Sequence, residues 1–204
     1  MTTAVNVRTV VATRPLLIAG AVAGPLFLVV VLIQAYSHDG FDPARHPLSS
    51  LVLGDQGWVQ VANFFVCGLL SLAGAVGLRR AGAGTWGAVL VGAGGAGLLV
   101  AGLFQTDPIN GYPVGTADTV TWHGTVHSMG PGVAGLAGLA AFVVFARRFA
   151  RQGERGWLAW TIATPVAVIA ADVASFAAGD FRLLLLSQAL VTAWTTTLYA
   201  KMLR

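Results

Sequence analysis

The chain has 204 residues, of which 56% are hydrophobic and 10% charged, and its mean hydropathy is +0.75. Soluble domains carry about 25% charged residues, so this composition excludes a water-soluble globular protein and indicates an integral membrane protein. The net charge of +4 does not indicate nucleic-acid binding, because the basic residues lie where membrane topology places them. The single cysteine, Cys67, excludes an intrachain disulfide.

Six stretches of the chain are long and apolar enough to span a bilayer, which takes about 20 residues per helix. They lie at 15–36, 57–78, 85–104, 123–146, 157–177 and 183–200. Because open sheet edges cannot face lipid, these stretches predict an all-α fold, a polytopic bundle of six transmembrane helices. We expect one transmembrane domain over residues 15–200, flanked by an N-terminal tail at 1–14 and a C-terminal end at 201–204.

The basic residues separate between the two sides of this topology. One side holds Arg8, Arg14, Arg79, Arg80, Arg147, Arg148, Arg151, Arg155, Lys201 and Arg204, whereas the other holds Arg45 and Arg182. The positive-inside rule therefore places both termini in the cytoplasm. Apart from Lys201 every basic residue is arginine, beside much alanine and glycine, which favours a GC-rich bacterial genome and the bacterial cytoplasmic membrane.

Small and aromatic residues have regular positions along the predicted spans. Small residues recur every four positions on two spans, as Ala93, Gly97 and Ala101 and as Gly130, Ala134 and Gly138. Such stripes let helix backbones approach closely, so we expect them to be packing faces. Aromatic residues near the boundaries are expected to form interfacial belts: Trp58, Tyr112 and Trp122 outside, and Trp86, Trp157, Trp160 and Tyr199 inside.

Polar side chains gather in the outer half of the spans. Asp172 is the one acidic residue well inside a span, about five residues or 7 Å below its outer end. Asn63 and Gln188 lie at similar depth, and Gln105 lies nearer the surface. The inner half is mostly apolar, so the sequence predicts a pocket that opens outward, is closed to the cytoplasm, and accepts a small or lipid-like ligand.

Two histidines, His123 and His127, open the fourth span four residues apart, and therefore lie on one helical face about 6 Å apart along its axis. Such a pair is able to bind a metal, with Asp107 or Asp172 completing a zinc-like set. The residue after His123 is Gly124, so the metalloprotease pattern H-E-x-x-H is absent. In the alternative, His123 anchors at the interface and His127 hydrogen-bonds to a neighbouring helix.

Asp172 and the first outer loop are two further candidate sites. Ionisable groups at membrane depth commonly mark functional sites, so Asp172 is a candidate ligand, proton carrier or general acid. Its alternative role is a buried hydrogen bond to Gln188 or His127. In the loop, Arg45 and His46 are suited to an anionic head group and Ser49 to a polar ligand. The loop is equally well explained as a solvated connection, with Ser49 or Ser50 capping a short helix before Leu51.

Two stretches carry a family resemblance: His46-Pro-Leu-Ser-Ser-Leu-Val-Leu-Gly54, leading into Trp58 and Asn63-Phe-Phe, and Asp107-Pro108 followed by His123-Gly-Thr-Val-His127. From about residue 15 to 200 the chain resembles bacterial six-span membrane proteins catalogued as domain of unknown function 998, which implies an architecture without a mechanism. A looser likeness is to the membrane hydrolases that include alkaline ceramidases. It implies zinc held by His123 and His127 beside Asp107 or Asp172 and Ser49 or Ser50, although this chain has six spans rather than seven.

These observations leave several functions open. The first is a membrane protein with an outward-facing polar pocket for a small or lipid-like ligand, in its sharpest form a metal-assisted hydrolase with zinc at His123 and His127. The alternatives are a non-catalytic structural or accessory membrane protein, and a metal-free enzyme that uses Asp172 as an acid on a prenyl or lipid substrate. The expected partners are the lipid bilayer and a ligand from the outer side, and the oligomeric state is left open.

Overall fold

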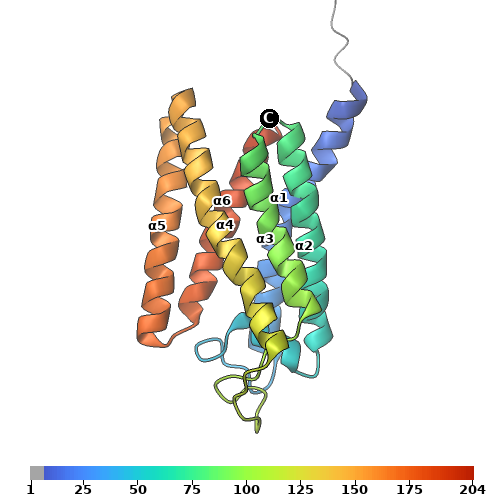
Figure 1. Cartoon of the computed structure of the whole chain (residues 1–204), viewed down its shortest axis with the longest axis vertical. Coiled ribbons are helices and arrows are strands. Elements are labelled where there is room, and N and C mark those ends of the chain that lie inside the picture. The colour runs from blue at the N-terminus through green and yellow to red at the C-terminus, as the bar shows by residue number, and fades with distance from the viewer. Residues whose placement is uncertain (1–6) are drawn as a thin grey trace, which may run out of the picture.

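The protein is a bundle of long helices, described over residues 7–204 in a computed structural model (Figure 1). The helices are α1 (Val7–Ser37), α2 (Gly57–Arg80), α3 (Thr85–Leu103), α4 (Trp122–Gln152), α5 (Arg155–Ala178) and α6 (Arg182–Met202), with a short 3-10 helix η1 (Leu48–Leu53). All six α-helices are long and apolar enough to cross a membrane, which confirms the predicted bundle of transmembrane helices. Helix α1 starts eight residues before its predicted span, but its apolar part begins at Thr13.

The six helices form a ring. Each helix packs against the next one in the sequence, and α6 returns to pack against α1 (Figure 1). Helices on opposite sides of the ring, such as α3 and α6, are not direct neighbours. The centre of the ring must therefore be filled by side chains or left as a cavity.

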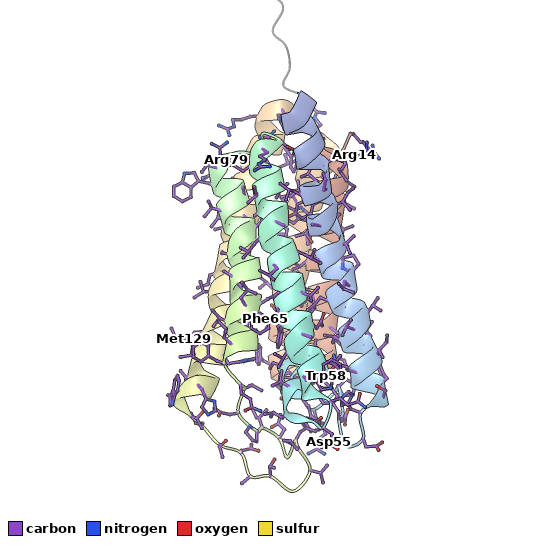
Figure 2. The ribbon with its side chains drawn as sticks, turned by 90° about the vertical axis from the view of Figure 1, so that its right-hand side faces the viewer. Arg14, Asp55, Trp58, Phe65, Arg79 and Met129 are labelled. Carbon is purple, nitrogen blue, oxygen red and sulfur yellow. The ribbon has the colours of Figure 1, made fainter. Side chains whose placement is uncertain are left out.

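The two ends of the bundle differ in charge and in structure. We call the end formed by residues 38–56 and 104–121 the loop end, and the opposite end, with Arg14, Arg79 and Lys201, the basic end. Figure 2 shows Arg14 and Arg79 at one end and Asp55 and Trp58 at the other. The charges thus separate along the bundle axis as membrane topology requires, and a cytoplasmic basic end stays a prediction of the positive-inside rule.

Aromatic side chains fill the ring near the basic end. Phe142, Phe145 and Phe149 of α4 pack with Trp194 of α6, and the ring centroids of Phe142 and Trp194 lie 4.4 Å apart. Tyr199 belongs to the same cluster, and its ring lies in the space left by Gly20 and Gly74. This half of the bundle is a closed apolar core.

A second core lies near the loop end, between α1, α2, α3 and the loops. It contains Phe27, Phe64 and Ala101 of the helices, with Phe41 and Tyr112 of the two loops. The Tyr112 ring packs edge-on against Phe41, with centroids 5.2 Å apart. The loops are therefore attached to the helices by apolar contacts as well as by hydrogen bonds.

The predicted aromatic belts are partly wrong. Trp58, Trp86 and Trp122 are more than two-thirds exposed, as residues of a membrane interface should be. Tyr112 and Tyr199 are instead 3% and 2% exposed, because each ring is enclosed by other parts of the protein. Position near a span boundary indicated depth correctly and gave no information about the direction of these side chains.

The small-residue stripes form a close contact between α3 and α4. A Cβ atom added at Gly97 would lie 2.6 Å from the carbonyl oxygen of Gly130 and 2.7 Å from the Cβ atom of Ala134. The predicted packing faces are therefore confirmed for these three residues. Gly138 differs, because an added Cβ atom there would meet nothing within 4 Å.

Candidate functional site

The junction between α3 and α4 is built around the carboxylate of Asp107. Thr121 donates to it from both its backbone N–H (2.8 Å) and its hydroxyl (2.6 Å), and these hydrogen bonds lower the pKa of Asp107 below its ordinary value. The Thr121 side-chain oxygen in turn accepts from the backbone N–H of Gly124 at 3.1 Å, which makes Thr121 the N-cap of α4. The Asp107 carboxylate therefore fixes the start of the helix that carries both histidines.

The two histidines bind the chain at the end of α3. His123 donates from Nδ1 to the carbonyl oxygen of Gln105 at 3.0 Å, and His127 donates from Nδ1 to the carbonyl oxygens of Phe104 (2.7 Å) and Ala101 (2.9 Å). A helix leaves its last carbonyls without intrahelical partners, so His127 caps α3 from the neighbouring helix. This is the arrangement expected if the pair has a structural role.

A metal set at the histidine pair would need a third ligand. Donation from Nδ1 leaves each Nε2 atom available, and the Nε2 of His127 is buried without a partner. Within residues 7–204, however, no group of three His, Cys, Asp or Glu side chains is placed to hold a metal ion. The zinc site at His123 and His127 thus stays a prediction, with neither Asp107 nor Asp172 positioned to complete it.

Replacing His127 with alanine is expected to lower the free energy of unfolding by about 2–3 kcal/mol, because two carbonyls lose a donor and a cavity forms. His123→Ala is the matched control and should cost less than about 1 kcal/mol, since His123 is partly exposed and has one carbonyl partner. Thermal unfolding of the detergent-solubilised protein measures both. A chelator that destabilised the wild type as much as His127→Ala does would contradict the capping role and favour a bound metal.

Other predicted site residues join the loops to each other. His46 accepts from the backbone N–H of Asp42 at 2.9 Å and donates to the carbonyl oxygen of Asn110 at 3.3 Å. Asn110 donates back to the carbonyl oxygen of Arg45 at 2.7 Å, while the Arg45 side chain is exposed. These bonds connect residues 38–56 to residues 104–121, so the backbone of the loop end is tied together across the bundle.

The serines of the first loop do not cap a helix, so that expectation is wrong. Helix η1 begins at Leu48 after Pro47 and has no side-chain cap, because both Ser49 and Ser50 lie inside it. Ser50 is buried and Ser49 half-buried. Gln105 takes part through its backbone carbonyl, and its side chain is exposed.

Asn63 belongs to a buried amide network between α1 and α2. It donates to the carbonyl oxygen of Phe27 and to the side-chain oxygen of Gln60, both at 3.3 Å, and Gln34 donates to the same Gln60 oxygen at 2.8 Å. Cys67 donates from sulfur to Asn63 at 3.3 Å. Asn63 thus holds two helices together within the bundle, away from any open space.

A cavity of about 670 Å³ occupies the middle of the ring and is lined by residues of all six α-helices. Of the predicted site residues, Asp172 and Gln188 line this cavity and the others do not. Its end toward the basic side is formed by Phe142, Trp194 and Tyr199 of the aromatic core. The polar groups predicted to share one outer layer therefore lie in different places. They are found at the loop end, at the α3–α4 junction, in the α1–α2 amide network and in this cavity.

The cavity reaches the outer surface of the bundle between α4 and α5. Leu136 of α4 and Ile169 of α5 both line it, and they are 71% and 48% exposed. Figure 1 shows these two helices close together near the basic end and diverging toward the loop end. Since this side of a transmembrane bundle faces lipid, these two lining residues lie at the lipid-facing surface.

A comparison with known families identifies the chain. The model of the family described as protein of unknown function (DUF998) matches residues 21–200. The chain belongs to this family. No curated protein and no solved structure matches it. The DUF998 match runs from α1 to α6 and so includes the cavity and the α3–α4 junction.

The lining of the cavity in this DUF998 protein includes a polar stripe on α6 that the sequence analysis missed. Gln188, Thr192, Thr195 and Tyr199 follow one another at spacings of four, three and four residues and all line the cavity. The hydroxyl groups of Thr192 and Tyr199 are buried without a hydrogen-bond partner. The helical period of these polar residues was a signal available in the sequence, because i, i+4 and i+7 share a helix face.

Asp172 is the residue of the cavity lining whose carboxyl group has no partner in the described protein. It lies on α5, six residues before Ala178, or about 9 Å from the loop end of the helix. Its carboxyl group forms no hydrogen bond or ion pair with the side chains described, those of residues 13–204, or with the described backbone. The alternative role of a buried hydrogen bond to Gln188 or His127 is therefore wrong, because His127 bonds to carbonyls of α3 and no hydrogen bond joins Asp172 to Gln188.

Proposed function

We propose that this DUF998 protein binds a lipid-like ligand that enters the central cavity from the bilayer. A volume of about 670 Å³ falls within the usual range of small-molecule sites, which is about 300–1,000 Å³. The lining is largely apolar and its lateral side consists of lipid-facing residues. The basic residues and the composition further support a place in the bacterial cytoplasmic membrane, with the basic end facing the cytoplasm.

The observation that carries this proposal is a face of α4 that consists of glycines and has no neighbouring helix against it. Gly132, Gly135 and Gly138 line the cavity, and a Cβ atom added at any of them would meet nothing within 4 Å. Small residues on membrane helices normally admit a neighbouring helix, as Gly97 and Gly130 do. On this face no helix approaches, so the space beside the three glycines is available to a separate molecule.

The length of the cavity favours an extended molecule over a compact solute. Along α6 its lining runs from Leu184 to Tyr199, which corresponds to about 22 Å of helix. The hydrocarbon core of a bilayer is about 30 Å thick, so the cavity spans most of it. A single acyl or prenyl chain has the shape and apolar surface that such a space accommodates.

The other functions have unequal support. A structural role fits the α3–α4 junction and the amide network, which hold helices together and need no ligand. An acid-catalysed reaction on a prenyl or lipid substrate requires the binding proposed here first, because Asp172 lies in the same cavity. The metal-assisted hydrolase requires a third metal ligand, which residues 7–204 do not place beside the histidines.

Filling the cavity should block binding without unfolding the protein. We expect Gly135→Leu to reduce specific labelling by a photoactivatable oleyl alcohol about tenfold or more, because the new side chain occupies the ligand's space. The experiment uses protein in phosphatidylcholine nanodiscs, with labelled peptides of α4 to α6 mapped by mass spectrometry. Leucine is a better helix former than glycine, so the melting temperature should not fall.

Gly156→Leu is the matched control for this test. An added Cβ atom at Gly156 also meets nothing within 4 Å, and Gly156 lies at the start of α5 outside the cavity. Labelling of the control should equal that of the wild type. Equal cavity labelling in the wild type and in Gly135→Leu would show that the probe does not bind there and would overturn the proposal.

A further inference from the structure

We infer that the ligand carries a cationic amine head group that pairs with Asp172. The inference rests on the proposed function and adds the chemical class of the ligand. Among the described residues that line the cavity, Asp172 is the only acidic or basic one, since no arginine, lysine or histidine contributes to the lining. The fixed charge available to a ligand in this space is therefore negative.

The other carboxylates near the helix ends have partners inside the protein. Glu154 forms an ion pair with Lys201, and Asp180 forms one with Arg182 at 2.6 Å. Asp107 accepts two hydrogen bonds from Thr121. Asp172 lies deeper in the bundle than any of these and has no partner. An unpaired carboxylate at membrane depth costs more free energy than a paired one or one at the surface. A partner supplied by the ligand removes this cost.

Charge complementarity decides between the head groups of common amphiphiles. A phosphate or carboxylate head would place a second negative charge beside Asp172 with no cation to offset it. An ammonium group forms a charge-assisted hydrogen bond with a carboxylate, which is about twice as strong as a neutral one. Gln188 lines the same space from α6, and its side chain makes no hydrogen bond with the described part of the chain, so its amide oxygen is available as a second acceptor.

The geometry also orients the ligand. Asp172 and Gln188 lie toward the loop end of α5 and α6, whereas Phe142 and Trp194 form the apolar end of the cavity toward the basic side. The amine therefore lies in the loop half, and the chain extends along the glycines of α4 toward the aromatic core.

Conduction of protons by Asp172 would need a polar route through that core, which is packed with Phe142, Phe145 and Trp194.

Three probes with one chain and different heads test the inference: oleylamine, oleyl alcohol and oleate. Each competes with the photoactivatable oleyl alcohol for cavity labelling in phosphatidylcholine nanodiscs. In the wild type we expect the amine to compete at about tenfold lower concentration than the alcohol, because it adds one hydrogen-bonded ion pair. Oleate should compete least.

Substitutions at Asp172 separate charge from shape. Asp172→Asn should make the amine and the alcohol equal competitors while alcohol binding persists, and Asp172→Glu should keep the preference for the amine. Asp180→Asn removes the same charge from a half-buried position after α5, outside the cavity, and should leave the preference unchanged. Melting temperatures of all three variants show whether each is folded.

The outcomes distinguish this inference from the proposal beneath it. If the three probes compete equally in the wild type, or if Asp172→Asn retains the amine preference, the head-group inference is wrong while lipid binding stands. If Asp172→Asn is folded and loses alcohol as well as amine, Asp172 is needed for any ligand and the cationic class is overturned. If the wild type shows no cavity labelling above Gly135→Leu, both proposals fail.

Discussion

Gly97→Ile is expected to abolish the folded bundle. Even the first atom of the new side chain would lie 2.6 Å from the carbonyl oxygen of Gly130. A Cβ atom added at Gly130 would likewise lie 2.8 Å from the carbonyl oxygen of Gly97, so the two backbones are in close contact. Backbone atoms cannot rotate aside as a side chain does, so α3 and α4 must separate. Overpacking of a well-packed contact costs about 1–3 kcal/mol in typical cores, and this backbone contact should cost more. Such a loss is a large part of the stability of a native protein.

Size-exclusion chromatography in detergent and thermal unfolding measure this effect. Gly94→Ile is the matched control on the same helix, because an added Cβ atom at Gly94 meets nothing within 4 Å. Gly94 lines the cavity, so this variant should remain folded and yet lose cavity labelling. A monodisperse Gly97→Ile protein with an unchanged melting temperature would show that α3 and α4 do not pack at this contact.

Gly124→Ala is expected to lower the free energy of unfolding by about 2–3 kcal/mol, as much as His127→Ala. A Cβ atom at this position would lie 1.9 Å from Oδ2 of Asp107, so the carboxylate must move. Movement breaks its two hydrogen bonds to Thr121 and thereby disturbs the N-cap of α4. This accounts for the glycine in the His-Gly-x-x-His element, since the helix start and the Asp107 carboxylate occupy adjoining space.

A double-mutant cycle tests this explanation of Gly124. In an Asp107→Ala background the alanine at Gly124 has no carboxylate to displace, so the two substitutions together should cost clearly less than the sum of their separate costs. Gly132→Ala serves as the control on the same helix, because its added Cβ atom meets nothing within 4 Å. It should leave stability unchanged or slightly raised. Additive costs at Gly124 and Asp107 would contradict a direct contact between them.

The fold was largely predictable because its main determinant is local. A run of about 20 apolar residues becomes a spanning helix whatever its neighbours are, since each backbone group must be satisfied within the segment. The six predicted spans therefore match α1 to α6, with differences confined to helix ends such as the start of α1 at Val7. That Gly97 and Gly130 lie on packing faces was also foreseeable, because small residues at a spacing of four form a face on any helix. That these two faces meet each other is known only from the structure.

The candidate site was less predictable, because position along a span does not show which way a side chain points around the helix axis. Asn63 and Asp172 were predicted at similar depth, and His127 about one turn below the outer end of its span, because depth follows from position along a span at about 1.5 Å per residue. Their directions around the helix axes differ: Asn63 bonds to α1, His127 bonds to the end of α3, and Asp172 faces the cavity. The sequence by itself determined the number, length and depth of the helices. Only the packing of the helices around one another decided which polar groups are partnered and which remain without a partner in the cavity.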